Sequence, residues 1–429
     1  MKRMRLLFSL CAFSLLQAEE TLTLEAAWRM ALAESPSEAV AQARLEQAEA
    51  RWRQARSAYQ PRLALTAQGA YAEPSDSARL QNPLLPDSLE QYEAGLRATY
   101  LIWDGGARRD RTRGARAGAD AAAAALEDSR LDLLASVGRA FTAAQLAREN
   151  LRIAQADADF QLRQLEDIRR REAAGAASRA DRLNFEIRGL AAENAAISAE
   201  AGFAAAMAAL TALLGQPAER PLPPPAAVDR NAPVSEAPGF EAAWDGTALR
   251  LPALQRAQLQ VDAAEAAIGA ARGTLAPSLA AFGDATASRL DDPGFGSDDL
   301  GTTVGLQLSW ELWDGGLRRQ QVAEARAVAD EARAGRTALT LQAQAELVQA
   351  LSEYNAAVQA EALAATTLDL TRENRDLVET AFRAGQESLL RLNEAQRDFT
   401  NAESRAVQAH LTRVLAWIEL QRAMGLLAP

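Results

Sequence analysis

Two segments of the chain alternate apolar and polar residues with a period of two. Apolar side chains occupy every second position through 92–102 and again through 304–312, and charged residues such as Glu93 and Arg97 lie between them. A weaker alternation runs through 63–71. This period predicts strands with one apolar face, which suit either a lipid-facing barrel wall or a half-buried sheet of a soluble protein.

The spacing of apolar residues changes after each of the two clear strands. Over 107–172 they recur at intervals of three, four and seven, which are coiled-coil intervals. A helix of this length would extend for about 100 Å. Further helices are predicted over 24–60, with a break near Pro36, and over 178–214 and 386–427. The positions that carry the long-helix pattern are Leu126, Leu133, Val137, Phe141, Ala144 and Leu151, with Leu341, Val348, Leu351 and Val358 in the second half.

The sequence contains an internal duplication. Leu24-Glu25-Ala26-Ala27-Trp28 returns 216 residues later as Phe240-Glu241-Ala242-Ala243-Trp244, and Pro36 and Pro61 return as Pro252 and Pro277. Later motifs are repeated at an offset of 210 residues. The second copy is therefore six residues shorter, and we place this difference in a surface loop, where a change of length costs the least free energy. The later pairs are Trp103-Asp104-Gly105-Gly106 with Trp313-Asp314-Gly315-Gly316, and Gly175 and Ser178 with Gly385 and Ser388.

The duplication predicts the domain organisation. We expect a first structural repeat over 19–214 and a second over 239–429, each with helices, two strands and a long helical hairpin. Residues 215–238 contain seven prolines and predict an extended linker. Four strands per chain cannot close a barrel, so strands placed in lipid require several chains.

The N-terminus has the features of an export signal. Basic residues precede a short apolar run from Leu6 to Leu16, and Ala18 offers a cleavage site, so 1–18 is predicted to be a signal peptide. Cys11, the only cysteine, falls within it. No later segment has eighteen consecutive apolar residues, and the sequence therefore predicts no transmembrane helix. The formal charge of −11 makes nucleic acid an unsuitable partner.

The sequence contains no recognisable catalytic or cofactor motif. His410 is the only histidine and has no repeated counterpart, while metal-ligand spacings and a phosphate-binding glycine loop are lacking. We therefore expect a protein that is not an enzyme and that has no catalytic residue, metal or cofactor.

The paired motifs have local structural uses. Asp104 and Asp314 can cap the following helices, and the adjacent glycines permit the strand-to-helix turns. Trp103 and Trp313 suit a membrane interface or core packing equally well. Gly175 and Gly385 suit tight turns between antiparallel helices.

The order and duplication of these motifs resemble the TolC family of outer-membrane efflux proteins, over about 22–427. The resemblance implies a mostly α protein with a membrane β-barrel portion, in which three protomers of long coiled-coil-like helices and four strands form one tunnel. It also implies an outer-membrane location with the helical tunnel in the periplasm, a homotrimer in contact with outer-membrane lipid, and partners that are an inner-membrane transporter and a periplasmic adaptor.

In this family the helical hairpin turns form the closed periplasmic entrance. The resemblance assigns Asp181, Phe382, Glu387, Arg391 and Glu394 to it. Arg391 stands where an aspartate is common, which departs from an aspartate-ring gate. An Arg391–Glu394 pair, three residues apart on one helix, would partly cancel charge.

Three functions are compatible with this pattern. The favoured one is passive conduction of substrates that a pump delivers. A duct for type I protein secretion needs the same tube. A soluble periplasmic coiled-coil scaffold is the alternative from a different class, and it would leave the alternating segments without a use.

Overall fold

The computed structural model describes residues 21–81, 88–217, 219–220, 222–230 and 233–428. The predicted signal peptide, 1–18, lies outside these residues. The chain forms two compact units, and each takes segments from both halves of the sequence. Unit 1 comprises Met1–Ala39, Ser129–Thr247 and Ala345–Pro429, and unit 2 comprises Val40–Asp128 and Ala248–Gln344.

Eight of the described helices form four pairs of equal length, one member from each half of the chain. Their lengths are 11, 22, 67 and 35 residues. The 67-residue members agree with the long helices that the coiled-coil spacing predicts. The pairs are α1 (Leu24–Glu34) and α6 (Phe240–Arg250), α2 (Pro36–Ser57) and α7 (Pro252–Gly273), α4 (Ala107–Ala173) and α8 (Leu317–Arg383), and α5 (Arg179–Leu213) and α9 (Leu389–Ala423).

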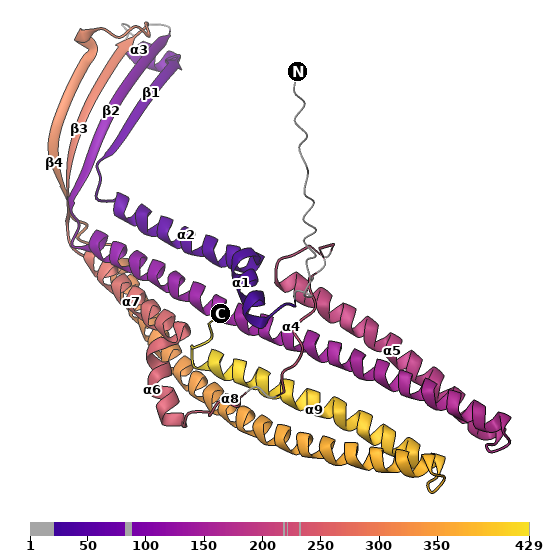
Figure 1. Cartoon of the computed structure of the whole chain (residues 1–429). Coiled ribbons are helices and arrows are strands. Elements are labelled where there is room, and N and C mark those ends of the chain that lie inside the picture. The colour runs from indigo at the N-terminus through magenta and orange to yellow at the C-terminus, as the bar shows by residue number, and fades with distance from the viewer. Residues whose placement is uncertain (1–20, 82–87, 218, 221, 231–232, 429) are drawn as a thin grey trace, which may run out of the picture. The chain divides into compact units, whose positions relative to one another are not determined.

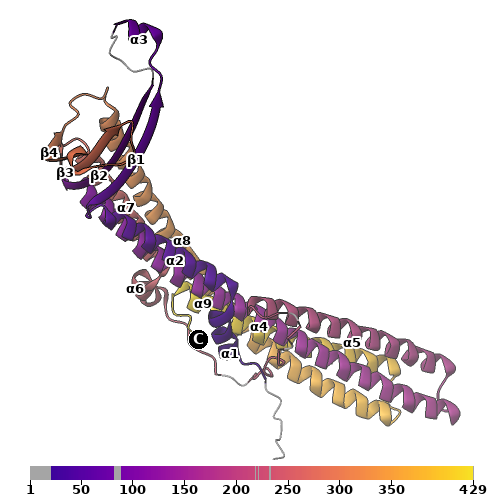
Figure 2. The same ribbon diagram turned by 90° about the horizontal axis from the view of Figure 1, so that it is seen from above.

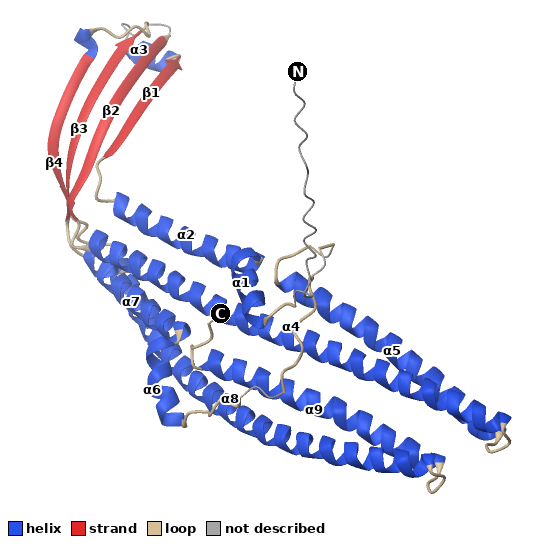
Figure 3. Ribbon diagram, in the orientation of Figure 1, coloured by secondary structure: helices blue, strands red, loops and turns tan. Residues whose placement is uncertain are grey.

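Unit 2 carries a four-stranded antiparallel sheet in the order β1-β2-β3-β4 (Figure 3). The strands are β1 (Arg62–Ala72), β2 (Leu89–Trp103), β3 (Ser278–Leu290) and β4 (Leu300–Ser309). The alternation predicted a strand as far as Leu312, but β4 ends three residues earlier. A short helix, α3 (Asp76–Gln81), lies between β1 and β2, where the polar, proline-containing sequence from Glu73 to Glu90 predicts a loop.

The register of the strands separates an apolar face from a polar one. Leu65 pairs with Leu96, and Leu96 pairs with Ala285, so these side chains share a face. On the other face Arg97 is opposite Asp284 and forms an ion pair with it. Leu65 is 78% exposed. An exposed apolar face backed by a polar one is the arrangement that a wall between lipid and water requires.

Unit 1 is built from two helical hairpins, α4–α5 and α8–α9, whose turns lie at the same end of the unit (Figures 1 and 2). Its largest apolar cluster packs α1 against α4 and α5, and the Trp28 indole N–H donates to the Leu134 carbonyl at 2.8 Å. Smaller clusters follow along the hairpins. The periodic apolar positions Leu133, Val137, Phe141 and Ala144 all lie in the largest cluster.

One described helix, α5, is long and apolar enough to cross a membrane, by its length and by the composition of its most apolar 18-residue window. It contains no run of eighteen consecutive apolar residues, because Glu193 and Glu200 divide its alanine-rich segment. Only 11% of that window is buried in the protomer. Its buried residues include Phe185 and Leu210, which pack on α4 within the first hairpin.

Candidate functional site

The first strand-to-helix turn joins β2 to α4. Gly105 and Gly106 have φ of 67° and 86°, which glycine adopts readily, and the Asp104 carboxylate accepts the backbone N–H of Arg108 at 2.7 Å. The Arg108 guanidinium donates to the carbonyls of Leu101 at 2.7 Å and Ala58 at 3.1 Å. The turn therefore ties the end of β2 to the ends of α2 and α4.

The second strand-to-helix turn uses the corresponding residues and adds an ion pair between Asp314 and Arg318. The Asp314 carboxylate accepts the Arg318 Nε at 2.6 Å and the backbone N–H groups of Gly316 and Arg318 at 2.9 and 3.1 Å. The bond from the Arg318 side chain is the largest cause that lowers the pKa of Asp314 to about 2. Trp103 and Trp313 flank these turns and are 47% and 82% exposed in the protomer, so neither is a core residue there.

The two hairpin turns close in the same way. Gly175 and Gly385 have φ of 75° and 74°, and each follows the last turn of a 67-residue helix. The N–H of Ala176 donates to the Arg171 carbonyl at 2.8 Å, and the N–H of Gly175 donates to Glu172 at 2.9 Å. The second hairpin repeats this pair of bonds, which is the Schellman arrangement.

The helices that leave the two turns are capped differently. Ser178 accepts the N–H of Asp181 at 3.1 Å, while the Asp181 carboxylate accepts the N–H of Ser178 at 3.2 Å, so both halves of a capping box are present. Ser388 accepts the N–H of Arg391 at 3.3 Å, but an arginine cannot return the bond. The carboxylate of Asp181 is thus engaged in the turn of its own hairpin.

Phe382 lies beneath the turns in an apolar cluster that the two hairpins share. It is 8% exposed, and Arg171 of the first hairpin lies over its ring at 5.2 Å. This cluster fixes the ends of the hairpins against each other. Its buried members are Phe160, Leu165, Ile168, Phe185, Val378, Phe382, Leu392 and Ala395.

The remaining predicted entrance residues lie on the second hairpin. Glu387 and Arg391 are exposed, and Glu394 is half-buried on α9. Among the described residues, Arg391 and Glu394 form no ion pair with each other, although they lie three positions apart on the same helix. Phe382, at the end of α8, therefore packs against the first hairpin. Glu387 and Arg391 face solvent in the protomer.

Polar bonds between α4 and α9 were missed by sequence reasoning. Gln396 donates to Asp157 at 2.9 Å, Arg152 pairs with Glu403 at 2.9 Å, and Ser404 lies 3.2 Å from Asn150. The partners are about 240 to 250 residues apart, so spacing in one sequence carries no signal for them. They connect the two hairpins on the side of the apolar cluster that is farther from the turns.

His410 lies in another buried contact of unit 1. Its Nδ1 lies 2.6 Å from the Glu361 carboxylate, which also binds Arg413, and the histidine is 3% exposed. Within the described residues, no group of three or more His, Cys, Asp and Glu side chains is arranged to hold a metal ion.

Comparison with known proteins identifies the family. The family described as outer membrane efflux protein matches residues 27–216 and 247–426. The chain belongs to this family. This efflux protein is also 30% identical over 418 residues to Protein CyaE of Bordetella pertussis, covering 92% of the chain and 83% of the relative. The predicted TolC-type family, the outer-membrane location and the efflux-duct function are confirmed.

Solved structures share the fold of this efflux protein. A membrane protein from Pseudomonas aeruginosa matches with a TM-score of 0.81 and 23% identity, over 94% of this chain and 90% of its own. The open state of the Neisseria gonorrhoeae MtrE outer membrane channel matches with a TM-score of 0.81 and 22% identity, over 94% and 89%. The Vibrio cholerae outer membrane protein VceC matches with a TM-score of 0.77 and 20% identity, over 94% and 96%. The mostly helical fold with a four-stranded sheet is thus confirmed.

Proposed function

We propose that this efflux protein works as a trimeric, passive duct, which receives its substrates from an inner-membrane transporter through a periplasmic adaptor. The observation that carries the proposal is the sheet, whose apolar face is exposed and whose edge strands β1 and β4 each pair with one strand among the described residues. Unpaired strand edges in lipid cost several kcal/mol for each polar group, so neighbouring protomers must cover them. The energy for transport comes from the transporter.

Exposed apolar stripes on the helices support assembly. On α8, Leu363, Leu370 and Leu377 follow one another at intervals of seven and are 63% to 71% exposed. On α5, Ile187 and Leu190 are 65% and 63% exposed. Stripes with this spacing pack into the grooves of neighbouring helices, and we assign them to contacts between protomers.

We assign the gate to the hairpin turns of unit 1. The Phe382 cluster and the α4–α9 bonds hold the hairpins together, and small sliding of packed helices would release them. Asp181 belongs to the capping box of the first turn, so we assign pore-facing charge to Glu387, Arg391 and Glu394 of the second hairpin.

The assembly is tested by measuring the molar mass of the detergent-extracted protein after separation of the outer and inner membranes. Three protomers per particle in the outer-membrane fraction would support the duct. A monomer or dimer that keeps its fold would contradict the trimer.

The gate is tested by single-channel conductance in planar bilayers. Asp157→Ala combined with Glu403→Ala removes two bonds between the hairpins, and we expect a larger open fraction. Glu419→Ala is the control, because Glu419 pairs with Arg139 on the same two helices but far from the turns. An unchanged open fraction in the double variant, or an equal increase in the control, would contradict a gate at the turns.

A further inference from the structure

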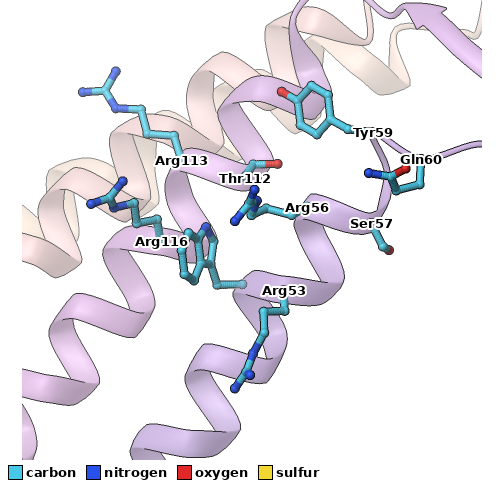
Figure 4. Close-up of a pocket in the computed structure, with 9 residues that line it drawn as sticks. Arg53, Arg56, Ser57, Tyr59, Gln60, Thr112, Arg113 and Arg116 are labelled. Atoms are coloured by element: carbon cyan, nitrogen blue, oxygen red, sulfur yellow. The ribbon is translucent and has the colours of Figure 1, made fainter.

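A basic pocket in unit 2 has no role in the duct described above. It lies between the end of α2 and the start of α4 and has a volume of about 920 Å³ (Figure 4). No carboxylate lines it among the described residues. We name it the arginine pocket; its lining residues are Trp52, Arg53, Arg56, Ser57, Tyr59, Gln60, Thr112, Arg113 and Arg116.

The arrangement of the arginines concentrates positive charge. Arg56 and Arg116 both lie against the Trp52 ring, at 5.5 and 5.8 Å from its centre. Arg56 and Arg113 have no carboxylate within ion-pair distance in the described part of the chain, while Arg53 and Arg116 make exposed pairs at 3.4 and 3.9 Å. Four guanidinium groups around one pocket whose described lining contains no carboxylate favour the binding of an anion.

The pocket is attached to the end of the sheet. Tyr59, on its wall, lies under the Arg108 guanidinium at 4.2 Å, and Arg108 also donates to the Leu101 carbonyl at the end of β2. Strand β1 begins at Arg62, directly after the pocket residue Gln60 and Pro61. Its second residue, Leu63, is 71% exposed. The pocket therefore lies at the level where an apolar, lipid-facing surface gives way to water, which is where lipid phosphates lie.

The second repeat provides an internal comparison. At the equivalent positions it keeps two arginines, Arg272 and Arg326, so the repeated fold does not depend on the rest of the pocket. Trp52, Arg53, Tyr59 and Arg113 are replaced there by Ile268, Gly269, Leu275 and Ala323. The aromatic wall and half of the arginines are specific to the first repeat.

We propose that the arginine pocket binds the phosphate of a phospholipid headgroup from the adjoining leaflet of the outer membrane. The guanidinium groups match the oxygens of a phosphate in pairs, and the acyl chains would lie along the apolar face of the sheet. This inference rests on the outer-membrane location and not on the proposed trimer or gate, and both of those have separate readouts.

The test is native mass spectrometry of the purified mature protein in detergent. Phosphatidylglycerol is compared with a diacylglycerol of the same acyl chains, and inorganic phosphate is added in a separate arm. We expect the wild type to retain phosphatidylglycerol about tenfold more strongly than diacylglycerol, and Arg56→Gln with Arg113→Gln to lose that preference.

Two matched variants keep the result interpretable. Arg56→Lys with Arg113→Lys keeps the charge and is expected to keep most of the preference. Arg272→Gln with Arg326→Gln removes the same number of charges from the second repeat and is expected to change nothing. Equal preference in the wild type and the glutamine variant would overturn the proposal. Binding of inorganic phosphate without any preference for phosphatidylglycerol would also overturn it, because the site would then serve free anions.

Discussion

Arg391 occupies in the second hairpin the position that Asp181 occupies in the first. Both residues donate their backbone N–H to a serine that caps the helix, at 3.3 and 3.1 Å. Only Asp181 returns a bond through its side chain. The two otherwise similar turns therefore differ in the stability of the helix that leaves them, and the less fully capped one carries the residues that we assign to the entrance.

Arg391→Asp should complete the second capping box. We expect the unfolding free energy of the protein to rise by about 0.5–1 kcal/mol, because a second backbone N–H gains a partner and an acid replaces a cation at a helix N-terminus. Thermal unfolding followed by circular dichroism measures it. Arg391→Ala is the control, and an equal gain in both variants would show that removal of the cation alone is responsible.

The glycines that begin the two strand-to-helix turns should respond unequally to alanine. A Cβ on Gly105 would lie 2.5 Å from the Gly273 carbonyl oxygen, whereas one on Gly315 would meet nothing within 4 Å. Both have positive φ, which costs about 1 kcal/mol for alanine. We expect Gly315→Ala to cost about this amount and Gly105→Ala to cost at least about 2 kcal/mol. Equal melting temperatures for the two variants would contradict this packing.

Phe382→Ala should leave a cavity in the cluster between the hairpins. Phe382 is 8% exposed, and truncation of a buried phenylalanine costs about 3–5 kcal/mol. We expect faster amide hydrogen exchange at both hairpin ends together with a lower melting temperature. Glu387→Ala, at an exposed residue of the same turn, is the control. Faster amide hydrogen exchange in the second hairpin alone would mean that the cluster does not hold the two hairpins together.

Asp314 should contribute a stability that acid removes. Its pKa is lowered from 3.8 to about 2, chiefly because the Arg318 side chain donates to the carboxylate. A lowered pKa stabilises the fold fully above the unfolded value, and this stability is lost as the pH falls from about 4 through about 2. Asp314→Asn should therefore melt below the wild type at pH 6, and the two should converge near pH 2. A constant difference across this range would be the contrary result. Asp298→Asn, at an exposed residue of the one-turn 3-10 helix Ser297–Asp299, corrects for the loss of one carboxylate.

Several features follow from the sequence by itself. The coiled-coil intervals over 107–172 predicted the bounds of α4 to within one residue, and the same spacing indicated a long helix where α8 lies, because a helix repeats its buried face every three or four positions. The motifs at offsets of 216 and 210 correspond to the equal helix lengths of the two halves. The alternation located β2, since a strand turns successive side chains to opposite faces.

Other features required the tertiary structure. β4 ends at Ser309 although the alternation continues, because Ser309 is opposite Ser278, the first residue of β3, so the next residues of the chain have no partner in β3. The capping box engages the Asp181 carboxylate within the first hairpin turn, while the assignment of Asp181 to the entrance stays a prediction.

The sequence by itself therefore determined the period, length and order of the elements, which depend on residues close together along the chain. Only the tertiary structure decided which distant residues meet, such as Asp157 with Gln396, or Trp52 with Arg116. Such pairs form where helices from separate segments pack side by side, and the distance between them along the chain leaves no periodic trace in one sequence.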